Sequence, residues 1–210
     1  MSDHDLTPAQ SRQALWDQRH AAQEPIESSE PDPTLVDEIG SLRPGRALDL
    51  GAGDGRNATW LARQGWQVTA VDFSGVAIER GRARAEAGGL EVDWQLADLL
   101  EWTPEARAYD LVTLFFIHLP REERRAVYAR AANAVAIGGT LLVVAHDRTN
   151  LANGVGGPQD PDVLVSPAEI AAELTGYRVE RAETMRRRAP DGRGPIDAIV
   201  RAVRVASVHV

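Results

Sequence analysis

Compact apolar runs recur along the chain between polar stretches and stretches of helical period. Apolar runs bounded by glycine, proline or acidic residues indicate strands, and apolar positions three and four residues apart indicate helices. The predicted strands are residues 47–50, 66–71, 91–96, 109–116, 140–145, 177–184 and 196–205. The predicted helices are residues 7–22, 34–39, 56–64, 74–87, 120–136 and 166–176. This order predicts an α/β fold, a doubly wound seven-stranded sheet whose last two strands form an antiparallel hairpin across a turn at 190–192.

Residues 1–33 differ in pattern from the rest of the chain. They hold one predicted helix and a connector rich in prolines and acids, so we expect an N-terminal lid segment. Residues 34–210 are expected to form a single cofactor-binding domain, because a chain of 210 residues is long enough to bury a sizeable core.

The stretch from Ala47 to Ala58, ALDLGAGDGRNA, joins the first strand to a helix through glycines spaced by two. Glycine at 51, 53 and 55 permits a tight turn and lets a ligand approach main-chain N–H groups that a Cβ would shield. Ligands of open α/β sheets bind beyond the carboxyl ends of the strands. The sequence therefore predicts a cofactor loop here.

The acids around these glycines indicate which cofactor the loop holds. Asp49 and Asp54 would repel a phosphate or pyrophosphate. S-adenosylmethionine has no phosphate and carries a net positive charge, so the same acids would favour it. The nicotinamide fingerprint G-x-G-x-x-G fails at Arg56, where its third glycine is due.

The spacing Asp49-x-Gly51-x-Gly53-x-Gly55 resembles the signature of class I S-adenosylmethionine-dependent methyltransferases. The resemblance covers residues 16–204 and implies a Rossmann-like fold, S-adenosyl-L-methionine as cofactor and S-adenosyl-L-homocysteine as product. The segments that most resemble one subgroup, the small tellurite-resistance and thiopurine S-methyltransferase-like enzymes, are residues 55–58, 116–120 and 156–160.

Two further acids fit the cofactor. Asp72 ends the second strand, where a carboxylate can accept hydrogen bonds from both ribose hydroxyls. The resemblance implies that Asp98 binds the adenine amino group and that the backbone N–H of Leu99 binds a ring nitrogen. The other cofactor-binding residues that it implies are Trp16, Arg19, Asp49, Gly51, Ala52, Gly53, Asn57, Phe73 and Phe115.

The first predicted helix allows two interpretations. Leu15, Trp16 and Arg19 share one face, as in any amphipathic helix that packs on a domain. In methyltransferases that this chain resembles, a similar element closes over the methionine end of the cofactor, where Arg19 would pair with its carboxylate.

His118 and His146 are the candidate catalytic residues, since each follows a predicted strand of the sheet. Each is either a general base or a packed wall of the acceptor pocket, and the sequence shows no unambiguous base dyad. The five histidines are scattered without metal-ligand spacing, so we expect no metal. The chain also lacks the Asn/Asp-Pro-Pro-aromatic motif of the family's amino-directed DNA enzymes after residue 116.

Two segments allow two interpretations each. The long stretch 148–165, with its glycines and prolines, is either a cover over the substrate or a surface loop. Residues 186–188 are three consecutive arginines, which form a solvated loop or attract an anionic substrate.

Composition limits the kinds of binding partner and the cellular compartment that we expect. The net charge of −8 disfavours nucleic acid, and the absence of cysteine excludes disulfides and thiolate metal sites. No apolar stretch is long enough for a spanning helix and the N-terminus lacks a secretion signal, so we expect a cytoplasmic protein without a membrane partner. The oligomeric state is not readable from the pattern.

Methyl transfer from a sulfonium demands mainly position and exclusion of water, so the acceptor's acidity decides what else is needed. The first hypothesis is a small soft nucleophile: a thiol, a selenium or tellurium oxyanion, or a halide. The alternatives are O- or N-methylation of a phenol or amine, a cofactor-binding protein without chemistry of its own, and a nicotinamide oxidoreductase.

Overall fold

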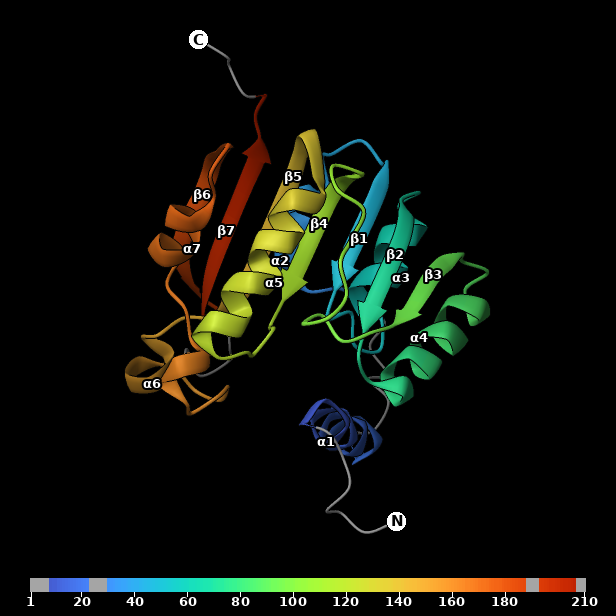
Figure 1. Cartoon of the computed structure of the whole chain (residues 1–210), viewed down its shortest axis with the longest axis horizontal. Helices are drawn as coiled ribbons and strands as arrows, with labels where there is room; N and C mark the ends of the chain where they lie inside the picture. Colours follow the sequence, from blue (N-terminus) through green and yellow to red (C-terminus); the bar gives the residue numbers. More distant parts are fainter. Residues whose placement is uncertain (1–7, 23–29, 188–192, 207–210) are drawn as a thin grey trace. The chain divides into compact units, whose positions relative to one another are not determined.

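A computed structural model of the chain describes residues 8–22, 30–187 and 193–206. Their seven strands run in the order β3-β2-β1-β4-β5-β7-β6, and the chain divides into two compact units, Met1–Trp102 and Thr103–Val210 (Figure 1). The predicted doubly wound seven-stranded α/β sheet is thereby confirmed. The predicted turn at 190–192 lies outside the described residues, and the lid boundary at residue 33 stays a prediction.

The first unit carries three parallel strands. Its elements are α1 (Pro8–Ala22), α2 (Pro33–Ile39), β1 (Arg46–Leu50), α3 (Arg56–Arg63), β2 (Gln67–Asp72), α4 (Gly75–Ala87) and β3 (Val92–Leu96). Leu50 at the end of β1 pairs with Val71 in β2. This parallel register brings the loop after β1 next to Asp72, the last residue of β2.

Local signals in the sequence place the helices of the first unit. Ser74 caps α4, because its side chain accepts a hydrogen bond from Ala77 N at 3.2 Å. Gly65 follows α3 with φ +90°, the left-handed conformation common just after a helix. α2 is capped by Asp32 and has proline at its first position, so it begins one residue before the predicted start.

The second unit combines parallel and antiparallel pairing. Its elements are β4 (Tyr109–Phe115), α5 (Arg121–Ala134), β5 (Val135–His146), α6 (Asn150–Asn153), the 3-10 helix η1 (Pro161–Val163), α7 (Pro167–Glu173), β6 (Tyr177–Arg186) and β7 (Ile196–Arg204). β4 and β5 are parallel, whereas β7 is antiparallel to both β5 and β6. The predicted C-terminal hairpin is confirmed.

One predicted helix end is wrong. Residues 138 and 139 were expected to separate a helix from a strand, but β5 already begins at Val135 and runs through both glycines. Gly138 adopts φ +83°, and the register of β4 against β5 shifts between Tyr109 and Leu111. Glycine here permits an irregularity within the strand instead of ending an element.

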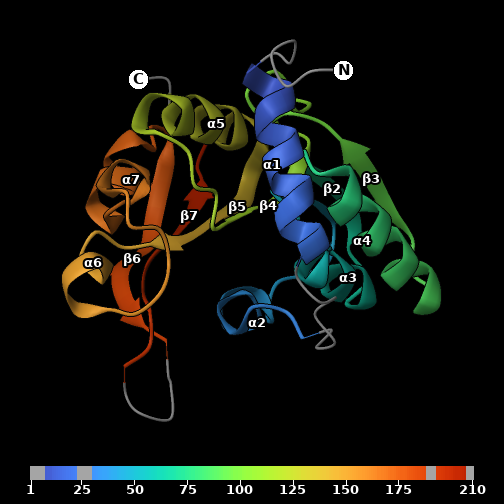
Figure 2. The same ribbon diagram turned by 90° about the horizontal axis from the view of Figure 1, so that it is seen from below.

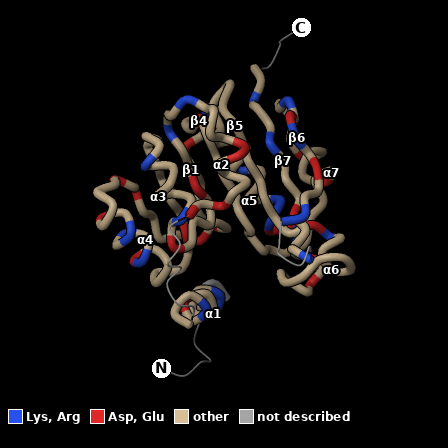
Figure 3. Tube along the Cα trace, turned by 180° about the vertical axis from the view of Figure 1, so that it is seen from behind, with Lys and Arg blue, Asp and Glu red and all other residues tan. Residues whose placement is uncertain are grey.

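β6 lies at the edge of the sheet and is mostly exposed. Basic and acidic residues alternate along it, as Figure 3 shows, and Arg178 pairs with Glu180 at 2.7 Å. Charged side chains on an edge strand discourage pairing with another chain. Among the described residues, no helix is both long and apolar enough to cross a membrane.

Candidate active site

The loop after β1 is built from glycines in the left-handed conformation. Gly51, Gly53 and Gly55 have φ values of +70°, +56° and +78°, a region that residues with a Cβ rarely adopt. The backbone N–H groups of Gly51 and Ala52 donate to Val71 O at 2.8 and 3.0 Å. The predicted tight turn is present, and backbone hydrogen bonds attach it to the end of β2.

Asp72 supports this loop through hydrogen bonds. Its Oδ2 accepts from Gly53 N at 2.8 Å and its Oδ1 accepts from Ser74 N at 2.9 Å. Each carboxylate oxygen has two lone pairs, so a half-exposed Asp72 retains acceptor capacity for the hydroxyls of a ribose. The structure thus brings Asp72 to the glycine loop as the sequence predicted, and its role in binding the ribose stays a prediction.

Asp54 differs from the expectation drawn from its charge. Arg84 of α4 donates to Asp54 O at 2.7 Å and to Asp54 Oδ2 at 3.0 Å. Because this guanidinium balances the carboxylate, Asp54 does not argue for a cationic ligand. Asp49 is 1% exposed on β1.

The remaining cofactor candidates of the first unit lie around the same loop. Asn57 is buried in the first turn of α3, and its Oδ1 accepts from Asp32 N at 2.9 Å. Asp98 follows β3, where Oδ1 accepts from Leu100 N at 2.9 Å and Oδ2 lies 3.5 Å from Arg12. Phe73 and Leu99, at the ends of β2 and β3, are half-buried.

Helix α1 packs on the first unit beside the start of α4 (Figure 2). Asp17 accepts from Ser74 Oγ at 2.5 Å, and Arg80 donates to the carbonyl of His20 at 2.5 Å. The ring of His20 also lies 3.9 Å from where a Cβ on Gly53 would stand. The guanidinium of Arg19 stacks on the indole of Trp16 at 4.8 Å, so the assignment of both residues to the cofactor stays a prediction.

The second unit holds a histidine cluster, which we define as Phe116, His118, His146, Arg187 and Asp197. The two imidazoles are nearly parallel, with an interplanar angle of 9° and ring centroids 5.4 Å apart. The ring of Phe116 lies 5.2 Å from that of His146, and Arg187 stacks over the same phenyl ring at 4.9 Å. Both candidate catalytic histidines therefore belong to one packed group.

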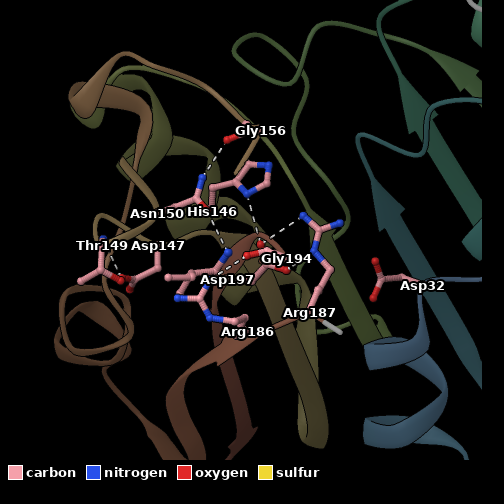
Figure 4. A network of polar contacts seen from close by, with 12 residues as sticks. Asp32, His146, Asp147, Thr149, Asn150, Gly156, Arg186, Arg187, Gly194 and Asp197 are labelled. Carbon is pink, nitrogen blue, oxygen red and sulfur yellow. Dashed lines mark hydrogen bonds and ion pairs between the residues drawn. The ribbon is translucent and has the colours of Figure 1, made fainter. Parts of the chain in front are cut away.

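Asp197 is fully buried on β7 and lies between His146 and Arg187 (Figure 4). Its Oδ1 is 3.1 Å from Nδ1 of His146, and its Oδ2 is 2.6 Å from Nε of Arg187. If Nδ1 of neutral His146 carried the lone pair, that lone pair would face the negative carboxylate and be repelled by it. We therefore assign the proton to Nδ1. Nε2 then carries the lone pair and is the atom able to accept a proton.

The backbone of Phe116 is strained. It follows β4 with φ +55°, a conformation that bulky residues seldom adopt. Phe115, the cofactor candidate before it, is 7% exposed at the end of β4, in the second unit. The strained residue thus turns the phenyl ring toward His146 while its neighbour stays in the core.

Segment 148–165 has ordered structure of its own, in α6 and η1. Arg148 at its start bonds both carboxylate oxygens of Glu169 at 3.0 Å. Partial burial opposes ionisation of Glu169, but the bonds from Arg148 and Ser166 outweigh it and lower the pKa of its carboxyl. Both ends of the segment are therefore anchored, and its role as a substrate cover stays a prediction.

Comparison with known proteins identifies one domain of the chain. A model of the methyltransferase domain matches residues 47–139, which include the glycine loop, Asp72 and Asp98. These residues form a methyltransferase domain, and the chain resembles the class I S-adenosylmethionine-dependent methyltransferases.

Relatives of this chain differ in the acceptors that their names state. Ribosomal RNA small subunit methyltransferase C of Alcanivorax borkumensis is 30% identical over 67% of this chain and 42% of its own length. The ubiquinone biosynthesis O-methyltransferase of Xylella fastidiosa is 28% identical over 81% of this chain and 76% of its own. The chain thus spans less than half of the first of these relatives.

Solved methyltransferase structures share the fold. TehB from Haemophilus influenzae has a TM-score of 0.67 and 21% identity, with 81% of this chain and 61% of TehB covered. At this identity the likeness shows the fold alone.

Two residues of the histidine cluster were not predicted from the sequence. Asp197 is an acid inside an apolar strand, a signal of a buried charge that needs a partner. Arg187 was placed in a solvated run, but it pairs with Asp197, and Arg186 belongs to β6 and donates to Gly194 O at 3.0 Å. The interpretation as a solvated loop is wrong for Arg187, whereas Arg186 is exposed but lies in a strand instead of a loop, and Arg188 lies outside the described residues.

Proposed function

We propose that the protein methylates a small-molecule acceptor from S-adenosylmethionine, most readily a soft nucleophile that carries a proton, namely a thiol. The single observation that carries the proposal is His146 beside the buried carboxylate of Asp197, with Nε2 able to accept a proton. Halides and the oxyanions of selenium and tellurium belong to the same soft class; a halide has no proton to lose, and the oxyanions need less help from a base than a thiol does.

The first unit supplies the residues that fit the cofactor. Gly53 and its neighbouring glycines present backbone N–H groups without a shielding Cβ, and Asp72 offers acceptors for a ribose. When bound there, S-adenosylmethionine supplies an electrophilic methyl group and a good leaving group. The protein's remaining task is to place the acceptor, exclude water and prepare the nucleophile.

Acceptor acidity determines how much His146 contributes. A free thiol has a pKa of about 8.5 and is only partly ionised at neutral pH, so removal of its proton raises the concentration of the reactive thiolate. Nε2 of His146 would take that proton, and Asp197 would stabilise the imidazolium formed. General bases of this kind contribute roughly 10²- to 10⁴-fold in rate.

A second candidate acceptor is a phenol or amine. A phenol, with a pKa of about 10, depends on a base more strongly than a thiol does, and the same His146–Asp197 pair favours it. The name of the relative from Xylella fastidiosa, an O-methyltransferase, supports this alternative. A cofactor-binding protein without turnover is the third.

A nucleic-acid acceptor deserves a place among the test compounds, because the name of one relative states ribosomal RNA. The net charge of −8 argues for a small molecule, since phosphate binding needs a positive surface.

The test measures S-adenosylhomocysteine release by mass spectrometry with thiols, phenols, amines, selenite, tellurite, halides and ribosomal RNA. We expect acceptor-dependent release that falls about 100-fold in His146→Gln with a thiol, but little with a halide. Asp72→Asn should weaken S-adenosylmethionine binding about tenfold by calorimetry, whereas Asp93→Asn, an exposed acid on β3, should not. Release by wild type that His146→Gln leaves intact with every protonated acceptor would refute the role of this base.

A further inference from the structure

The imidazole of His146 is packed against the backbone of Gly157. A Cβ on this glycine would lie 3.0 Å from Cδ2, 3.0 Å from Nε2 and 3.1 Å from Cε1 of the ring. A point nearly equidistant from these three atoms lies above the ring, not in its plane along the lone pair of Nε2. Gly157 therefore covers one face of the imidazole. It does not block the direction in the ring plane along which Nε2 would accept a proton.

Only glycine fits this wall without displacing the ring. Carbon contacts are optimal at about 3.5–4.0 Å, so an added methyl group at 3.0 Å would push the imidazole. The neighbouring Gly156 shares the left-handed conformation, with φ +68° against +75° for Gly157, but nothing lies within 4 Å of its Cβ position. The two glycines differ in the contact with His146 and hardly at all in backbone conformation.

Asn150 fixes the position of this wall. It is 3% exposed, its Nδ2 donates to Gly156 O at 2.8 Å and its Oδ1 accepts from Ile196 N at 2.8 Å (Figure 4). The residue before Gly157 is thereby tied to the residue before Asp197. One side chain sets the spacing between the backbone that walls the imidazole and the strand that carries its carboxylate.

The carboxylate alone leaves the angle of the ring undetermined. Nδ1 of His146 lies 3.1 Å from Asp197 Oδ1, yet its direction does not meet that of a well-formed hydrogen bond. A charge contact of this kind attracts the ring without fixing its tilt. The packing of the ring against Gly157, together with its contacts to His118 and Phe116, supplies that constraint.

We infer that Gly157 is a positioning residue, which holds the imidazole of His146 at the tilt that aims Nε2 at the acceptor's proton. Asn150 is the side chain that keeps Gly157 in place. This inference rests on the proposed function, in which His146 is the base. It gives segment 148–165 a role in orienting the base for protonated acceptors.

A tilted base impairs proton removal and nothing else. The loss caused by Gly157→Ala should therefore grow with the acceptor's pKa, because an acceptor that is already ionised needs no base. A general weakening of the fold would instead lower turnover of all acceptors alike. The dependence on acceptor acidity separates a positioning role from a structural one.

The experiment compares Gly157→Ala with Gly156→Ala in steady-state assays with a series of thiols and phenols of graded pKa. Both variants carry the same left-handed strain, and Gly157→Ala also displaces the imidazole, so chemical denaturation should find it the less stable of the two. For Gly157→Ala we expect kcat to fall about twofold with an acceptor ionised at the assay pH, and about tenfold or more with one of pKa near 10. S-adenosylmethionine Kd should stay within about twofold of wild type. Gly156→Ala should behave like wild type throughout.

Two results would overturn the inference, and neither is mistaken for failure of the proposed function. If His146→Gln loses activity but Gly157→Ala equals Gly156→Ala, His146 is the base and Gly157 does not position it. If Gly157→Ala loses the same factor with every acceptor, its role is structural. If His146→Gln retains full activity with all protonated acceptors, the proposed function itself fails.

Discussion

The glycine loop and the histidine cluster are built in opposite ways. The loop is nearly contiguous, from Asp49 to Asn57 with Asp72 as its distant support. The cluster takes Phe116 and His118 from after β4, and its other members from β5, from β7 and from the residue after β6. The conformation of the loop depends on its own residues, whereas the cluster forms only after strands that are far apart in the sequence have paired.

This contrast follows from what each site needs. The loop needs φ values that only glycine adopts cheaply, so the requirement is visible as residue type at fixed spacing. The cluster needs a buried carboxylate beside His146, and any strand of the sheet can supply one. Spacing along the chain carries no information about that choice.

The largest expected effect tests the loop. Gly55→Ala should destabilise the protein by roughly 3 kcal/mol or more, because the new Cβ would overlap the indole of Trp94 in addition to the left-handed strain. Trp94 is 9% exposed and would also be overlapped by a Cβ on Gly81, so it has little room to move. Chemical denaturation measures the loss, and calorimetry should show S-adenosylmethionine binding abolished.

Gly65→Ala is the matched control for this change. Gly65 has φ +90°, but the nearest atoms to its Cβ position are those of Pro44 at 3.8 and 3.9 Å, an ordinary contact. It should cost only the strain, about 1–2 kcal/mol. Equal losses in the two variants would show that the packing of Trp94 against the loop contributes nothing.

The sequence predicted the fold and the loop because both depend on local signals. Apolar periodicity and caps such as Ser74 placed the elements, and the glycine spacing placed the cofactor loop. It failed where a residue's role depends on a distant partner. Arg84 neutralises Asp54 from α4, and Arg187 pairs with Asp197 from the end of β6. Neither ion pair produces a repeating pattern in the sequence. The acid inside the apolar strand β7, however, indicates a buried charge that needs a partner.

The next effect in size tests the cluster. Asp197→Asn keeps the shape of the side chain but removes the charge that faces His146 and Arg187. The variant should lose about 2 kcal/mol of stability, less than for a fully buried pair because the side chain of Arg187 is 33% exposed. Turnover of a thiol should fall about 100-fold, since nothing then favours the proton on Nδ1.

A double variant separates stability from chemistry in the cluster. Arg187→Met added to Asp197→Asn removes the cation left without its partner, so denaturation should show stability largely restored. Turnover should stay low, because His146 still lacks a carboxylate. Recovery of turnover along with stability would show that Asp197 acts through folding alone.

The smallest effect refines the description of the loop as local. Arg84 reaches from α4 to the carbonyl and carboxylate of Asp54, so the loop has a further support, besides β2, that its own sequence does not contain. Arg84→Met keeps much of the apolar stem and should cost about 1 kcal/mol of stability, with S-adenosylmethionine Kd raised about threefold to tenfold. Arg82→Met is the control, because Arg82 lies on the same helix but donates to Trp94 O, at 3.2 Å. If calorimetry finds the same Kd for both variants, the glycines and Asp72 hold the loop by themselves, and the contrast with the histidine cluster is complete.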